Sequence, residues 1–221
     1  MFGLDERIAA FSNGTTLLIV AVVSILLGLR HASDPDHLAA VTAMVASGKE
    51  RAARHAAQLG LTWGLGHATS LFAFGLPVVF YTAYLPEPVQ KAAETGVGLL
   101  IVALAIVLLV RWRRGFRGGA TRTGFQAYCI GLVHGMGGTA GAGLLLLATI
   151  HSRPLAVGAL AIFALCTATS MTLLSTSFGF ALSRAAAHRS FHRVAPVFGS
   201  VSILFGIWYA LGAQGFVPYV L

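Results

Sequence analysis

The most reactive part of the sequence is the segment 28–37, where polar side chains interrupt an apolar stretch. Imidazole nitrogen combined with carboxylate oxygen suits borderline divalent ions such as Ni, Co, Zn or Cu, whereas Mg and Ca prefer all-oxygen sites. Buried charges must be paired or must coordinate a metal, so the segment is either an ion-pair network around Arg30 or a metal site. We favour the metal site, whose candidate ligands are His31, Asp34, Asp36 and His37.

The candidate ligands, like most of the chain, lie in six long apolar stretches. The chain has 221 residues, of which 57% are hydrophobic and 10% are charged, whereas an average soluble domain has roughly 25% charged residues. Each stretch reaches the roughly 20 residues that a helix needs to cross the hydrocarbon core. The sequence therefore predicts an all-α, polytopic membrane protein with a single transmembrane domain, 1–221. The predicted spans are 15–46, 56–84, 89–110, 124–150, 155–183 and 196–220.

The first stretch, 15–46, is too long for one straight span. Its 32 residues would form a helix of about 48 Å at a rise of about 1.5 Å per residue. Pro35 lacks an amide hydrogen and frees the carbonyl of His31, so we expect the helix to break near Pro35. Broken helices at membrane depth line polar cavities and mark the binding sites of many transporters.

The basic residues lie unevenly between the stretches. Only Arg7, Lys91 and Arg153 fall on one side, whereas eleven of the fifteen fall on the other. The positive-inside rule places these eleven in the cytoplasm and both chain termini outside it, across a cell membrane. The net charge of +8 thus indicates orientation and requires no nucleic-acid partner. The eleven are Lys49, Arg51, Arg54, Arg111, Arg113, Arg114, Arg117, Arg122, Arg184, Arg189 and Arg193.

Two further histidines, His67 and His134, fall inside apolar stretches. Counted from the predicted cytoplasmic ends, both lie about 14 to 16 Å deep, as does His37, and Ser175 falls in the same layer. A single histidine within a membrane most often forms a hydrogen bond between helices. The shared depth instead favours His67 and His134 as further metal ligands.

The sequence also suggests an internal duplication. Gly-Leu-Arg-His at 28–31 recurs as Gly-Leu-Val-His at 131–134, an offset of 103, and His-Ala-Thr-Ser at 67–70 recurs as Thr-Ala-Thr-Ser at 167–170, an offset of 100. Three spans separate the copies, so the two halves would have opposite orientations. This 3+3 inverted-repeat arrangement places a substrate near the midplane. Chance matches in Gly- and Ala-rich helices are the alternative.

These residues resemble a known family. His31, Asp36 and His37 have the spacing of the HX4DH signature of the nickel and cobalt transporter family, and residues 65–69 resemble its LGH[DS][ST] motif. The resemblance covers most of the chain. It implies a helical permease for nickel or cobalt ions in which the HX4DH residues are required for transport and selectivity.

The chain departs from the family pattern in its number of spans and in two later motifs. Family members commonly have eight spans, with the signature in the second. The motif LGFDTATE corresponds to residues 132–139, which lack both acids, and GMxLxDTxD corresponds to residues 170–178, where Ser175 and Phe178 replace the acids. The chain thus resembles a divergent short branch, similar to urease-accessory and high-affinity nickel permeases, which implies a link to urease or hydrogenase maturation.

We therefore expect uptake of Ni²⁺ or Co²⁺ as the transported substrate, with no prosthetic group and no enzymatic activity. Asp34 is either a ligand or a residue that supports one. An exporter that uses the same site is the nearest alternative. A different class of protein, a haem-binding electron carrier, would use His67 and His134 as axial ligands and leaves both aspartates unexplained.

Overall fold

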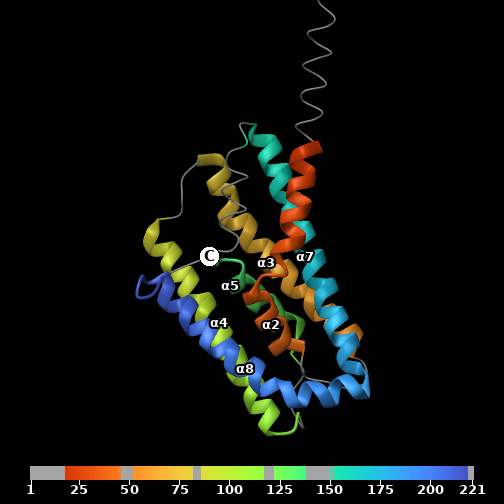
Figure 1. The fold of residues 1–221 in the computed structure, drawn as a ribbon. Helices are drawn as coiled ribbons and strands as arrows, with labels where there is room; N and C mark the ends of the chain where they lie inside the picture. The colour runs from red at the N-terminus through yellow and green to blue at the C-terminus, as the bar shows by residue number, and fades with distance from the viewer. Residues whose placement is uncertain are drawn as a thin grey trace, which may run out of the picture.

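The computed structural model describes residues 18–45, 52–81, 86–116, 122–137, 150 and 152–218. All regular secondary structure within these ranges is helical (Figure 1). The all-α fold expected from the sequence is therefore confirmed.

Four helices are long and apolar enough to cross a membrane, which makes the chain a multi-pass membrane protein. A bent pair, Leu18–His31 followed by Asp36–Thr42, is a fifth candidate span among the described residues. The four are α3 (Ala52–Tyr81), α4 (Glu87–Arg113), α7 (Arg153–Ser183) and, within α8 (Ala185–Ala213), the part Phe191–Ala213.

The first apolar stretch is broken near Pro35, as predicted. The first helix ends at His31, α2 (Pro35–Val45) begins at the proline, and the two helices meet at 50°. Asp34 N donates to the His31 carbonyl at 3.2 Å, so this carbonyl keeps a donor where the helix stops. Proline is favourable as the first residue of a helix, because an amide hydrogen at that position would have no carbonyl acceptor within the helix.

The fourth apolar stretch is also interrupted, which the sequence analysis did not predict. Thr123 starts α5 (Gly124–His134) with a reciprocal cap, because its hydroxyl accepts from Gln126 N and its own amide donates to Gln126 Oε1. The helix ends after 11 residues at His134, and residues 135–137 form a turn. The remainder of the predicted span, 138–149, lies outside the described residues.

The last span was predicted with the wrong bounds. Helix α8 begins at Ala185 and contains Pro196 in its interior, whereas the prediction treated that proline as the first residue. The helix ends at Ala213, short of the predicted end at 220, because Gly215 adopts φ +80°. Such a residue closes a helix in the Schellman arrangement, and Phe216 N accordingly donates to Leu211 O at 3.0 Å.

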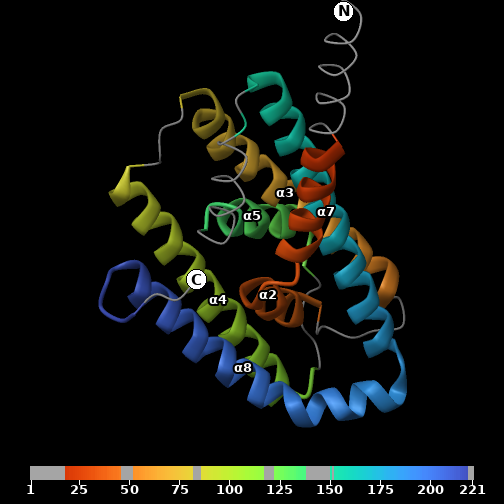
Figure 2. The same ribbon diagram turned by 45° about the horizontal axis from the view of Figure 1, so that its top comes forward.

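The long helices form two antiparallel pairs, α3 with α7 and α4 with α8, and the short helices α2 and α5 lie between them (Figure 2). Close approach in the second pair depends on Gly98 and Gly206, since a Cβ on either would come within 2.7 Å of the other's carbonyl oxygen. Small residues of this kind let membrane helices pack at short distance.

Helix α5 packs on α3 through direct backbone contact. A Cβ on Gly131 would overlap the Trp63 carbonyl oxygen and approach His67 N to 2.8 Å. One turn away, Ser70 Oγ donates to Leu132 O at 2.6 Å.

The first helix packs on α7 through an equivalent set of contacts. A Cβ on Gly28 would lie 2.7 Å from Phe163 O and 3.1 Å from Thr167 N. Ser170 Oγ donates to Leu29 O at 3.2 Å. Each contact is thus repeated with the offsets of 103 and 100 residues already seen in the sequence.

Replacing Gly131 by alanine should destabilise the protein, because the added methyl meets backbone atoms that cannot rotate away. We expect a loss of about 1–3 kcal/mol, read as a lower melting temperature of the detergent-solubilised protein. Gly158→Ala is the matched control, since nothing lies within 4 Å of its Cβ and alanine improves helix propensity by up to about 1 kcal/mol. Equal melting temperatures for the two variants would contradict the contact.

Candidate metal centre

The two helix breaks bring the polar residues together. The first helix ends at His31, α2 carries Asp36 and His37 in its first turn, and α5 ends at His134. His67 comes from the middle of α3. All five side chains are buried, with exposed fractions of 4% for His31, 2% for Asp36, 0% for His37, 1% for His67 and 2% for His134.

Asp36 joins two of the imidazoles. Its Oδ1 lies 3.0 Å from His37 Nδ1, and its Oδ2 lies 3.1 Å from His134 Nε2. An ionised carboxylate only accepts hydrogen bonds, so both histidines donate to it. In their neutral forms they therefore carry lone pairs on His37 Nε2 and His134 Nδ1.

Asp34 accepts a hydrogen bond from His31 in the same way. Its Oδ2 lies 3.1 Å from His31 Nδ1, which fixes the proton there and leaves a lone pair on His31 Nε2. That atom lies 3.0 Å from His67 Nε2. Asp34 thus contacts the second nitrogen of a candidate ligand, which is how carboxylates orient metal-binding histidines.

His37 is at the centre of the cluster. Its ring centroid lies 4.6 Å from that of His31, 5.1 Å from that of His67 and 4.4 Å from that of His134. These distances leave no space for a haem between His67 and His134, since the macrocycle would displace His37. The haem alternative therefore does not fit the site.

Three buried imidazole nitrogens of this cluster have no hydrogen-bond partner within the described part of the chain: His37 Nε2, His67 Nδ1 and His134 Nδ1. Such atoms are rare in folded proteins and each needs an explanation. Two overlapping sets of ligand atoms are close enough to hold an ion, with all atoms of a set within 4.8 Å of one another. The first set comes from His31, His37 and His67, and the second from Asp36, His37 and His134.

Two aromatic residues that the sequence analysis missed enclose the cluster. Trp63 packs edge-on against His134 at 5.8 Å between centroids, and Phe163 lies 5.7 Å from His31. The signal for Trp63 was its position four residues before His67, which puts both side chains on one helical face. Water is excluded where these rings cover the imidazoles, because both aromatic residues are buried.

Arg30 and Ser175 lie outside the cluster. Arg30 is exposed and makes no ion pair with any residue that the structure describes, so the ion-pair network around it is not observed. Ser175 is buried, but it packs against Gly60, which precedes His67 by seven residues on α3. It therefore faces the same helix as the cluster at a different level.

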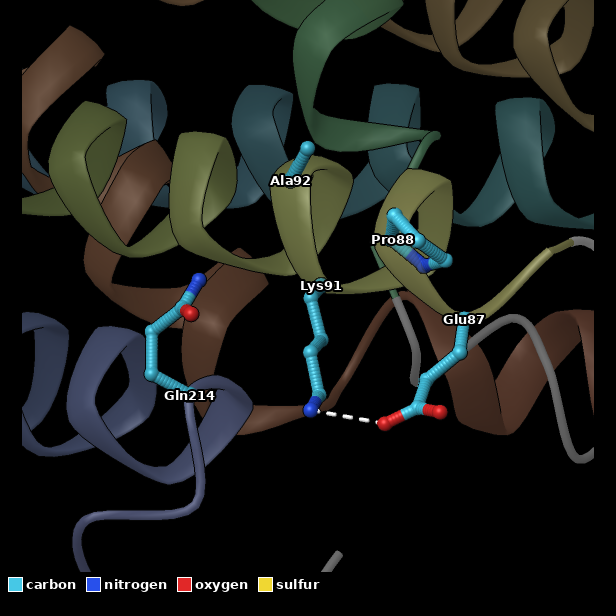
Figure 3. Close-up of a pocket in the computed structure, with 5 residues that line it drawn as sticks. All are labelled: Glu87, Pro88, Lys91, Ala92 and Gln214. Carbon is cyan, nitrogen blue, oxygen red and sulfur yellow. Dashed lines mark ion pairs between the residues drawn. The ribbon is translucent and has the colours of Figure 1, made fainter.

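A surface pocket of about 380 Å³ lies apart from these residues, at the start of α4 (Figure 3). Glu87 and Lys91 line it, and Lys91 Nζ lies 2.7 Å from Glu87 Oε1. The ion pair cancels the charge of the carboxylate, so this pocket offers no preference for a cation. Glu94 is a buried acid on the same helix, and Gln90 Nε2 donates to its Oε1 at 3.0 Å.

Comparison with known proteins relates the chain to nickel transporters. Residues 17–122, which include the HX4DH residues and His67, match the family model NicO, described as high-affinity nickel-transport protein. A urease accessory protein, UreH, of Bacillus sp. is 25% identical over 209 residues, covering 87% of this chain and 91% of that protein. The first half of the chain thus matches the NicO family, over 106 of the 221 residues. This is a transporter family rather than an enzyme family, as the sequence analysis expected.

Two further relatives of the chain carry names that refer to nickel. A high-affinity nickel transport protein of Cupriavidus necator is 32% identical over 117 residues, half of this chain and a third of that longer protein. A protein of Methanocaldococcus jannaschii named as a nickel/cobalt efflux system is 26% identical over 196 residues, covering 86% of this chain and 92% of that protein. No solved structure matches the chain.

Binding of Ni²⁺ to the purified protein should depend on His37 and, less strongly, on Asp34. His37→Ala removes the residue shared by both ligand sets, so we expect no measurable binding by isothermal titration calorimetry. Asp34→Asn only removes the acceptor that orients His31, and loss of such a partner weakens metal binding about 10–100-fold. His192→Ala, an exposed histidine outside the cluster, is the control. Binding by His37→Ala at the wild-type level would exclude this site.

Proposed function

We propose that this protein carries Ni²⁺ or Co²⁺ across the membrane through the buried cluster, with His31, Asp36, His37, His67 and His134 as ligands and Asp34 as the residue that orients His31. The observation that carries the proposal is the convergence of four imidazoles and a carboxylate at two helix breaks. Nitrogen and oxygen donors suit these ions. The names of the Cupriavidus and Methanocaldococcus relatives support the same substrates.

The spacing of His31 and His67 supports an ion with bonds at right angles. Two nitrogens each about 2.1 Å from one ion are about 3 Å apart at 90°, the angle of tetragonal Ni(II) sites. The observed separation of their Nε2 atoms is 3.0 Å. Without an ion, the same pair shares one proton, and the ion replaces it.

We infer that the ion occupies two positions in turn, because the two ligand sets share His37. One position has three imidazoles, and the other has two imidazoles with the Asp36 carboxylate. An ion that exchanges His31 and His67 for Asp36 and His134 keeps one ligand throughout. Such exchange lowers the cost of moving a bare cation through an apolar region.

We also propose six spans in a single transmembrane domain, 1–221, arranged as two inverted halves of three spans each. In this proposal the first helix and α5 are equivalent, as are α3 and α7, and α4 and α8. Three observations favour it: the paired glycine contacts, the paired serine hydrogen bonds, and the antiparallel packing of the equivalent long helices. The distribution of basic residues favours both termini outside the cytoplasm.

We propose uptake as the direction of transport. An inside-negative potential of 100 mV favours inward movement of two charges by about 4.6 kcal/mol. Export through the same cluster is the second candidate, and the name of the Methanocaldococcus relative favours it. The relation to UreH supports delivery of nickel to urease maturation as the role of uptake.

Cells that express the protein should accumulate radiolabelled Ni²⁺ or Co²⁺ above the level of cells without it, and His37→Ala should abolish the difference. His192→Ala, produced in equal amount, should accumulate as the wild type does. Accumulation below the level of cells without the protein would establish export instead. Undiminished uptake by His37→Ala would exclude transport through the cluster.

Replacing His67 or His134 by alanine should separate binding from transport. Each single variant keeps one ligand set complete, so Ni²⁺ binding should stay within about tenfold of wild type, whereas the double variant should lose it. Transport into proteoliposomes should fail in all three variants, because the ion needs both positions. If one single variant loses binding as fully as the double variant does, the ion has only one position.

A further inference from the structure

The second half of the chain contains basic residues but no acidic ones. All seven acidic residues occur at or before Glu94, and nine arginines follow it. Several of these lie where α4 ends, α5 begins and α7 passes into α8: Arg111, Arg113, Arg122 and Arg184. Clusters of basic residues beside a membrane attract anionic lipid headgroups.

One of these arginines lines a pocket between α4 and α5, which we call the Arg122 pocket. Its volume is about 380 Å³. Its walls combine apolar side chains from both helices with the guanidinium of Arg122, and Phe125 at its edge is 76% exposed. The lining residues are Leu104, Arg122, Phe125, Gln126, Cys129 and Ile130.

The guanidinium of Arg122 is partly buried and incompletely bonded. Its Nη1 atom is buried and has no hydrogen-bond partner among the described residues. Burial, and after it the charge of Arg111, lowers the pKa of Arg122 to about 10, so the group remains cationic at neutral pH. A buried donor without an acceptor is costly, and a nearby second guanidinium increases the cost. An anion in the pocket would accept a hydrogen bond from Nη1 and would offset the repulsion between the two guanidinium groups.

We propose that the Arg122 pocket binds the phosphate of an anionic phospholipid. The guanidinium fork matches phosphate oxygens in geometry and charge, and it is set among the apolar side chains of Leu104, Phe125 and Ile130. A soluble phosphate would use only the guanidinium, whereas a lipid also covers the exposed ring of Phe125. The site is separate from the metal cluster, since none of its lining residues belongs to either ligand set.

Native mass spectrometry of the full chain in detergent tests this proposal. We expect wild-type protein to retain phosphatidylglycerol at least tenfold more strongly than phosphatidylcholine, and Arg122→Gln to lose that preference, because hydrogen bonds to charged groups are worth about that factor. Arg113→Gln removes the same charge from an exposed position on α4 and should bind as the wild type does. Arg122→Lys, which keeps the charge without the fork, should be intermediate.

Three results would overturn the proposal. Equal retention of the two lipids by the wild-type protein would show that the pocket does not recognise an anion. Equal losses in Arg122→Gln and Arg113→Gln would show that only the total charge matters. Full displacement of phosphatidylglycerol by inorganic phosphate at the same concentration would show that the ligand is a free anion. The wild-type comparison decides the first point even if a variant fails to fold.

Discussion

The candidate metal centre depends on the hydrogen bonds that the buried carboxylate of Asp36 accepts. An ionised group loses several kcal/mol of hydration when it is buried, and the loss must be offset by good partners. Partners of Asp36 include His37 on its own helix and His134, which is 98 residues further along the chain. These two hydrogen bonds hold α2 against α5 and fix the position of the proton on each imidazole. The nitrogens left over carry the lone pairs that a metal requires.

Both helix breaks serve this arrangement. A helix that continued through residue 35 would spread His31, Asp36 and His37 around its circumference, since successive residues are about 100° apart at 3.6 per turn. Ending one helix at His31 and starting another at Pro35, at 50°, brings the three side chains to one place. The end of α5 at His134 presents the fourth imidazole in the same way. The glycine contacts Gly28 to α7 and Gly131 to α3 then set how closely these helix ends approach the long helices.

The sequence predicted the all-α class, the break near Pro35 and the resemblance to the nickel transporter family correctly, because each depends on a local signal. The approach of His67 and His134 to the signature residues was predicted from equal depth, and the structure brings them together. The role of Asp34 was left open, since the choice between a ligand and its supporting residue depends on which nitrogen of His31 the carboxylate reaches. The bounds of α8 were wrong because Pro196 is tolerated inside a membrane helix, where neighbouring groups can satisfy the freed carbonyl. Trp63 was missed because an aromatic residue on an apolar helical face is most often a core residue, so its spacing of four from His67 was not interpreted as part of the site.

In the proposed inverted-repeat arrangement, the proposed ligands are distributed unequally between the two halves. Under the offsets of 103 and 100, His31 corresponds to His134 and Trp63 to Phe163, and each of these aromatic rings covers the histidine of the other half. His67 corresponds to Thr167, and Asp36 to Thr139, so the second half lacks both partners. The three-imidazole set consequently belongs to the first half alone, and the set with a carboxylate joins the two halves. A relative movement of the halves would leave the first set intact and pull the second apart at the contact between Asp36 and His134. In the proposed transport cycle, that contact is therefore the place where a rigid movement of the helices changes the affinity for the ion.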